Sequence, residues 1–254
     1  TADDTGAGIR LNVKLRSELR DCTECLKLTP DQIREMEKQL TRARDATHAS
    51  NVELTIDLTP SDSGNPSASE VEIPSEIMDK FIELTMPLKI NATFAQFELP
   101  SEVTNKFANE GKGAMLSLGT VDRDRLNDNQ RLKVGDCTVI SANLKVGDQH
   151  MHQLGGKVKV TLPYQKDPGS TGPVKEWYLD DNNELTEIEA VFDEASGTIT
   201  FETDHFSYFV IGPASALGSG NSGDIQMIVA VIAIIIAAII ATVVIVRRVR
   251  TPNV

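Results

Sequence analysis

The stretch FETDHFSYFVIG, residues 201–212, decides the fold, because it ends a long run of predicted strands. Successive side chains of a strand point to opposite faces. Phe206 and Tyr208 would therefore share one face and belong to a core stripe, while His205 and Ser207 would share the other. We interpret the stretch as the last strand of a β-sandwich.

Further strands are predicted upstream, each an apolar or alternating segment between Gly, Pro and Asp turns. They span residues 114–121, 137–146, 149–154, 157–162, 174–179, 186–192 and 198–203. Many short strands at regular spacing are typical of an antiparallel sandwich. We therefore expect a mainly antiparallel β-sandwich over residues 71–212.

Residues 9–58 predict a small strand–helix–strand unit. Apolar and polar residues alternate from Ile9 and again from Val52, as in half-buried strands. Between them, Thr29 followed by Pro30 is typical of a helix start, since Thr caps the first turn and Pro fits the first helical position. The predicted fold class of the whole chain is α+β, with this unit first, the sandwich second and one transmembrane helix last.

The chain divides into six predicted segments, with Ser-, Pro- and Gly-rich stretches at the connections. An internal repeat, EIPSEIMDKF (72–81) and ELPSEVTNKF (98–107), predicts a duplicated strand–helix unit. The segments are an N-terminal α+β unit (1–58), a linker (59–70), the sandwich (71–212), a flexible tether (213–224), the transmembrane helix (225–246) and a cytoplasmic tail (247–254).

Residues 225–246 form a segment of 22 residues without a charge. As a helix it would be about 33 Å long, enough to cross a bilayer core of about 30 Å, and this length disfavours a buried core helix. Arg247, Arg248 and Arg250 follow at once, and positive residues stay on the cytoplasmic side. We expect a single-pass cell-membrane protein with its N-terminus outside. Because the sequence starts at Thr1 without Met or a secretory signal, we expect Thr1 to be a mature or truncated end.

The part of the chain before residue 225 is acidic. It holds 22 Lys and Arg against 37 Asp and Glu, a difference of −15. Such a surface repels nucleic acid and anionic lipid headgroups. We therefore expect no nucleic-acid partner and a solvated ectodomain. The chain also lacks a phosphate loop, a dinucleotide-binding fingerprint and a zinc-protease motif.

Three cysteines, Cys22, Cys25 and Cys137, are too few for a disulfide-stapled small domain. The C-x-x-C spacing of Cys22 and Cys25 is that of redox motifs, but one such pair cannot complete a four-ligand zinc site. The sequence leaves two alternatives: a structural disulfide among the three, or free thiols.

Three segments together resemble a known surface module. They are LGGKVKVTLPY (154–164), VKEWYLDDNNELTEIEAVFDEASGTITFETDHFSYFVIG (174–212) and the upstream ELPSEV. They look like a β-sandwich module of archaeal and bacterial cell-surface proteins that ends in a D-H-F-S strand. The module is distantly similar to the GAIN domain, the self-cleaving domain of adhesion receptors. The resemblance covers about residues 71–212 and implies an archaeal or bacterial surface protein.

The GAIN resemblance implies self-cleavage at His205-Phe206-Ser207. His205 would take the proton of the Ser207 hydroxyl, which would attack the Phe206 carbonyl carbon. The peptide bond must also be strained for the acyl shift to proceed. This chain departs from the receptor pattern, since it has no Cys after Cys137 and Trp177 is its only Trp. The alternative is a tripeptide that only packs, so enzyme activity is uncertain and limited to this one intramolecular cut.

Other polar clusters are candidates for binding. His150 and His152 share one face of a predicted strand, which is half of a metal site, and no third ligand is near in sequence. The DDNNE turn at 180–184 gathers carboxylates and amides, so it is either a weak Ca²⁺ candidate or a solvated hairpin tip. We predict no metal site and no other cofactor.

Asn91-Ala92-Thr93 is a glycosylation sequon, and alternation places Asn91 on the polar face of its strand. Alanines spaced four apart within 225–246 are typical of close helix contacts, which suggests copies of the chain as partners.

The predicted function is structural. An acidic extracellular sandwich, anchored in the membrane, would present or connect other surface proteins or copies of itself. The alternative is a self-cleaving receptor or processing module that cuts between Phe206 and Ser207. A carbohydrate-binding module is disfavoured because aromatic residues make up only 5% of the chain.

Overall fold

The structure, a computed structural model, describes residues 2–4, 9–47, 52–60, 64–166, 169 and 171–218. Its strands are β1 (Ala2–Asp4), β2 (Ile9–Arg20), β3 (Thr23–Leu26), β4 (Val52–Pro60), β5 (Ala68–Ile73), β6 (Leu88–Asn91), β7 (Gln96–Leu99), β8 (Ala114–Thr120), β9 (Thr138–Val146), β10 (Gln149–His150), β11 (Gln153–Pro163), β12 (Val174–Leu179), β13 (Leu185–Ile188), β14 (Ala190–Asp193), β15 (Thr198–His205) and β16 (Tyr208–Pro213). Its helices are α1 (Pro30–Thr47), α2 (Met78–Leu84), α3 (Ser101–Ala108) and α4 (Asp128–Val134), with short 3-10 turns η1 (Ser75–Ile77), η2 (Arg123–Arg125) and η3 (Ala214–Ala216).

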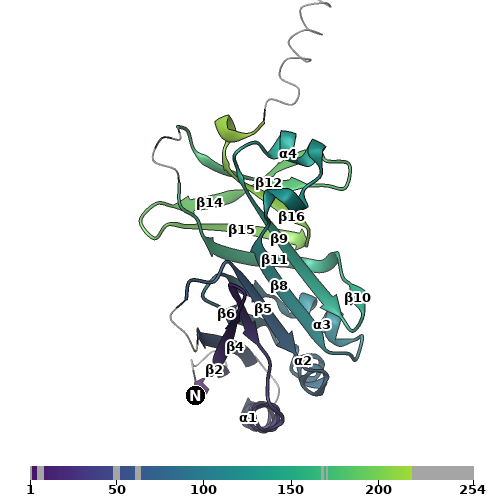
Figure 1. Cartoon of the computed structure of the whole chain (residues 1–254). Coiled ribbons are helices and arrows are strands. Elements are labelled where there is room, and N and C mark those ends of the chain that lie inside the picture. Colours follow the sequence, from purple (N-terminus) through teal and green to yellow (C-terminus); the bar gives the residue numbers. More distant parts are fainter. Residues whose placement is uncertain are drawn as a thin grey trace, which may run out of the picture.

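The strands join into one mixed sheet, which curls into two layers that share the long strand β2 (Figure 1). β2 pairs in parallel with β4 along most of its length, and its last three residues pair antiparallel with β3. One layer runs in the order β4-β6-β7-β11-β15-β14 and the other in the order β3-β5-β8-β9-β16-β12-β13. At the far ends only Glu189 separates β13 from β14, so the chain itself crosses between the two edges. The sheet therefore nearly closes on itself.

This architecture corrects the predicted fold class. We expected an α+β chain in which a separate strand–helix–strand unit precedes a mainly antiparallel sandwich, and this is wrong. β2, β3 and β4 lie in the middle of the strand order, and the pairs β2–β4, β3–β5 and β4–β6 are parallel. The fold is α/β with a mixed sheet. Periodicity shows which face of a strand is buried, but it does not identify the strand beside it.

The predicted fold class also included a transmembrane helix. None of the described helices combines the length and the apolar composition that a bilayer span requires. The predicted span, 225–246, lies outside the described residues, as do Arg247, Arg248 and Arg250.

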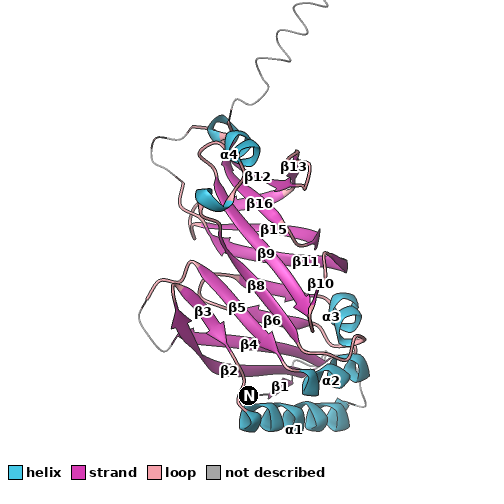
Figure 2. Ribbon diagram, turned by 45° about the vertical axis from the view of Figure 1, so that its right-hand side comes forward, coloured by secondary structure: helices cyan, strands magenta, loops and turns pink. Residues whose placement is uncertain are grey.

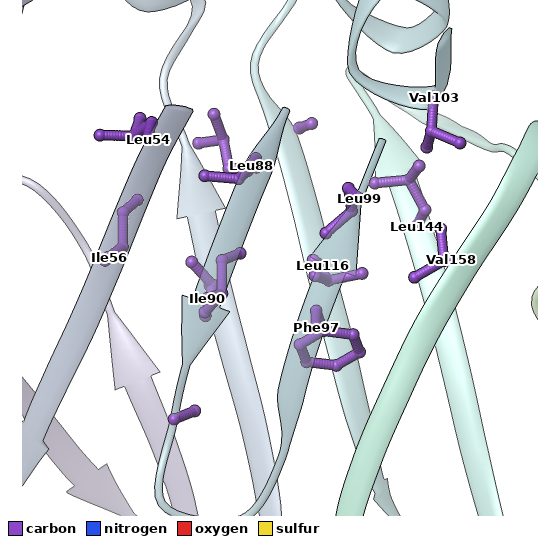
Figure 3. Close-up of a cluster of buried hydrophobic side chains, with 14 of the residues drawn as sticks. Leu54, Ile56, Leu88, Ile90, Phe97, Leu99, Val103, Leu116, Leu144 and Val158 are labelled. Atoms are coloured by element: carbon purple, nitrogen blue, oxygen red, sulfur yellow. The ribbon is translucent and has the colours of Figure 1, made fainter. Parts of the chain in front are cut away.

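The main core lies between the two layers. Alternate residues of each strand point into it, and Figure 3 shows those of β4, β6 and β7 side by side: Leu54, Ile56, Leu88, Ile90, Phe97 and Leu99. Burial of each such side chain is worth about 1.5–3 kcal/mol, so the inward faces of the strands provide much of the driving force for folding.

The helices lie at the margins of the sheet (Figure 2). The α1 start is confirmed: the Thr29 hydroxyl accepts the Gln32 backbone N–H at 3.3 Å, and the Gln32 side chain accepts the Thr29 N–H at 2.8 Å. Both copies of the internal repeat are a strand, a Pro and a helix, and α2 and α3 meet through Phe81 and Phe107, whose ring centroids are 5.8 Å apart. α1 and α4 lie at opposite ends of the molecule (Figures 1 and 2).

Candidate functional site

The stretch 201–212 is not one strand. β15 ends at His205, β16 begins at Tyr208, and the chain bends at Ser207 as it passes from one layer to the other. The Phe206 N–H donates to the His152 carbonyl at 3.1 Å, beside β11, and the Ser207 carbonyl accepts the Ala142 N–H of β9 at 2.9 Å. The tripeptide therefore joins the two layers.

The His205 side chain lies against Tyr178, a residue of β12. The ring centroids are 4.2 Å apart and nearly perpendicular, which is a favourable edge-to-face contact. His205 Nδ1 is 2.8 Å from Asp204 Oδ1, and this hydrogen bond lowers the pKa of Asp204. His205 Nε2 is buried and has no hydrogen-bond partner. If the Nδ1 proton is held by Asp204, Nε2 carries the free lone pair.

This geometry supplies part of what a cut requires. A carboxylate bonded to Nδ1 is the arrangement that orients the base in serine hydrolases. However, no hydrogen bond joins the His205 ring to Ser207 within the part of the chain that the structure describes. No residue of the tripeptide has a left-handed φ angle either. Cleavage between Phe206 and Ser207 therefore stays a prediction.

Glu176 is a candidate that the sequence analysis missed. It lies on the same face of β12 as Tyr178, is 0% exposed, and both of its carboxylate oxygens lack a hydrogen-bond partner. Burial raises the pKa of Glu176 to about 9, so the side chain is neutral at pH 7. The sequence signal is misleading, because a Glu that alternates with Trp177 and Leu179 normally marks the solvent face of a strand. Here β12 is covered on both faces.

Glu24 is a second buried carboxylate, and it has hydrogen-bond donors around it. It is 1% exposed and accepts the Ser17 hydroxyl at 2.7 Å. It also accepts the Thr93 backbone N–H at 2.6 Å and the Thr93 hydroxyl at 3.2 Å. These bonds tie the β2–β3 hairpin to the turn between β6 and β7.

The sequon residue Asn91 is half-buried and lines a shallow polar groove on the outer face of the sheet, together with Arg10, Lys14 and Lys89. Its Nδ2, the atom to which a glycan attaches, donates to Asp57 Oδ1 at 2.6 Å. A glycan would therefore have to displace Asp57. Glycosylation of Asn91 stays a prediction.

All three cysteines are free thiols in the structure. Cys22 is exposed in the turn of the β2–β3 hairpin, Cys25 is half-buried in β3, and Cys137 is buried just before β9. Burial raises the pKa of Cys25, and raises that of Cys137 to about 11. β5 and β8 lie between β3 and β9, so the lateral separation is about 14 Å, against the 7 Å or less that a disulfide requires between Cα atoms. A bond between Cys22 and Cys25 stays a prediction.

The two remaining clusters are placed as follows. His150 and His152 have stacked rings with centroids 6.3 Å apart. The turn at 180–184 joins β12 to β13, and the Asp180 side chain accepts the N–H groups of Asn182 and Glu184 at 2.9 and 2.7 Å. Among the residues with described positions, no group of three or more His, Cys, Asp or Glu side chains is arranged to hold a metal ion.

Comparison of the sequence with protein-family models and with curated proteins finds no match.

Proposed function

We propose that this chain is a membrane-anchored surface protein whose acidic body presents or connects other surface components or copies of itself. The observation that carries the proposal is the charge-free segment 225–246 followed by Arg247, Arg248 and Arg250. Such a segment is long enough to hold the chain in a bilayer, and the arginines favour a cytoplasmic C-terminus. The body before it then lies outside the cell.

The shape of the body supports this role. The last described residues, 214–218, lie beside α4, and α1 lies at the opposite end (Figure 2). An anchored body would therefore hold its α1 end away from the bilayer. Its outer sheet face carries polar and charged side chains, such as the ion pair Arg10–Glu53 at 3.0 Å, and is open to a partner.

Cysteine labelling tests the anchor and its orientation together. Cys22 is exposed, whereas Cys137 is buried. A membrane-impermeant maleimide added to intact cells should label the full chain at Cys22, and Cys22→Ser should remove most of the label. Labelling only after lysis would overturn the outside location.

The anchor itself is tested with Ile235→Asp combined with Ile236→Asp. Each charge at the centre of a span costs about 3 kcal/mol on insertion scales, so the double variant should leave the membrane fraction after carbonate extraction. The matched control is Ser219→Asp combined with Ser222→Asp, which adds the same charges outside the apolar segment. Equal extraction of both variants would contradict the anchor.

Self-cleavage is the second candidate function, and the Asp204–His205 pair beside Ser207 is the observation that favours it. Intact mass of the full chain under denaturing conditions is the test. A cut would yield two fragments that end at Phe206 and begin at Ser207, and Ser207→Ala would abolish them. One uncut species, identical in mass apart from the substitution, would leave the tripeptide as a packing element.

A further inference from the structure

The described chain ends on α4 in a fixed position. After η3, the Gly218 N–H donates to the Lys133 carbonyl at 3.1 Å, and the Asp136 N–H donates to the Ala216 carbonyl at 2.7 Å. A Cβ at position 218 would overlap the Leu132 carbonyl, so only glycine permits this approach. The last described residue, Gly218, therefore lies at the last turn of α4.

The connection from Gly218 to the apolar segment is short in sequence. Six residues, 219–224, separate Gly218 from Ile225. The seven steps from Gly218 to Ile225 span at most about 25 Å even when fully extended. The headgroup layer on each side of a bilayer is itself about 6 Å thick. If 225–246 enters the hydrocarbon, the end of α4 is held within about 20 Å of the headgroups and can reach them.

The surface of α4 suits this position. Leu132 is 66% exposed, and it is one of three large hydrophobic residues exposed among the described ones; the others are Ile82 and Val191. Asn129 is also exposed and lies one helical turn before Leu132 on the same face. Leu132, close to the last described residue, has no covering partner within the described part of the protein.

The charge of this end is acidic overall, as it is in the rest of the body. Residues 122–136 hold four acidic residues and four Arg or Lys, and the turn 180–184, which bonds to Asn127 and Lys133, adds Asp180, Asp181 and Glu184. The basic side chains are Arg123, Arg125, Arg131 and Lys133. The long stems of Arg and Lys can lie along an interface with the charged group at the phosphates. The net charge therefore does not draw this end to anionic headgroups, and the contact rests on exposed Leu132 and on the short connection to residue 225.

We propose that the α4 end of the body rests on the headgroups of the bilayer that holds residues 225–246, with Leu132 inserted at the interface. This proposal rests on the membrane anchoring proposed above. It adds a docking surface on the body, so the body has a preferred orientation on the membrane.

Tryptophan quenching in vesicles tests the proposal with the full chain. Leu132→Trp and Asn129→Trp place a probe on α4, and Ile82→Trp places a matched, 41% exposed probe on α2. The native Trp177 is buried and gives a background that the parent protein measures. The vesicles are phosphatidylcholine and phosphatidylglycerol, with or without bromine in the acyl chains. The α4 probes should lose a third or more of their fluorescence in brominated vesicles, and the Ile82→Trp probe should lose almost none.

Flotation of the same samples separates this proposal from the anchor. If the protein floats with the vesicles and the α4 probes are quenched no more than Ile82→Trp, the docking surface is wrong and the anchor stands. If the protein does not float, the anchor fails and the docking proposal fails with it. Quenching that is restricted to the two α4 probes in floating protein supports both.

Discussion

Glu24 and Glu176 are both buried glutamates, but only Glu24 has hydrogen-bond donors around it. Glu24 accepts bonds from Ser17 and Thr93, whereas neither oxygen of Glu176 has a partner. A buried carboxylate without partners is strongly unfavourable, so the side chain binds a proton instead. The protonation of Glu176 thus links the fold to pH.

The stability of the protein should therefore fall as the pH rises through neutrality. The pKa of Glu176 is raised to about 9 in the folded protein, and a Glu in an unfolded chain titrates near 4.3. Between these values the unfolded chain releases a proton that the folded chain retains, so the free energy of unfolding decreases by up to about 1.4 kcal/mol per pH unit. The contribution of protonated Glu176 to the free energy of unfolding is fully present below about pH 4. It is lost as the pH rises through the pKa of Glu176 in the folded protein.

The substitution Glu176→Gln removes this titration. It should raise the free energy of unfolding at pH 7 by about 4 kcal/mol and flatten its pH dependence between pH 5 and 8.5. Urea unfolding at several pH values measures both effects. Glu189→Gln, at an exposed position in the next connection, is the matched control for charge and should change neither. A parent protein whose stability does not decline over this range would show that Glu176 has a partner.

Cysteine reactivity should follow burial. Burial raises the pKa of the Cys137 thiol from 9 to about 11, which lowers its thiolate fraction at pH 7 about 100-fold. Exposed Cys22 should react first with maleimide and Cys137 last, as peptide mass spectrometry after short exposures can show. In urea, the difference between the maleimide reaction rates of Cys22 and Cys137 should vanish. Equal rates in the folded protein would place Cys137 at the surface.

At the scale of elements, the contact between α4 and residues 214–218 depends on Gly135. Its φ angle is +56°, and a Cβ there would overlap the Ala216 carbonyl. Gly111 has a similar φ of +63° but open space around it. Gly111→Ala should therefore cost only the backbone penalty of about 1–2 kcal/mol, while Gly135→Ala should cost more and release 214–218. Hydrogen exchange should accelerate at these residues in Gly135→Ala alone; equal exchange in both variants would mean that the contact does not form.

Several elements could be predicted from the sequence and others could not. The α1 start and β12 follow from a capping pair and a compact apolar run. α4 was missed, although Asn127 and Gln130 form the same kind of capping box, because its seven residues bury only Val134. The segment 186–192 was predicted as one strand, but the chain crosses between layers at Glu189. The local periodicity of apolar residues does not indicate where a chain crosses between layers.

At the scale of the whole molecule, the sheet is continuous because β2 serves both layers. Alternation in the sequence predicts β2 and β4 as strands but places them in a separate unit, since parallel pairing and long-range register leave no local signal. The same limit applies to the candidate site. The sequence pattern indicates His205 and Ser207. The contact of His205 with Tyr178, and the burial of Glu176 nearby on β12, arise only when β12, β15 and β16 come together.

The continuous sheet predicts that residues 1–58 and 71–212 unfold together, although the sequence suggested separate segments. Glu24→Ala, in β3, leaves the Ser17 hydroxyl and the Thr93 N–H without an acceptor and should cost about 3 kcal/mol. Trp177 lies in β12, five places from β3 in the strand order, and reports on the other end of that layer. If unfolding is cooperative, Glu24→Ala should lower the urea midpoint of Trp177 fluorescence by about 1 M, equal to the shift in far-UV circular dichroism. If residues 1–58 fold as an independent unit, the Trp177 transition should instead keep the parent midpoint while part of the dichroism signal is lost earlier.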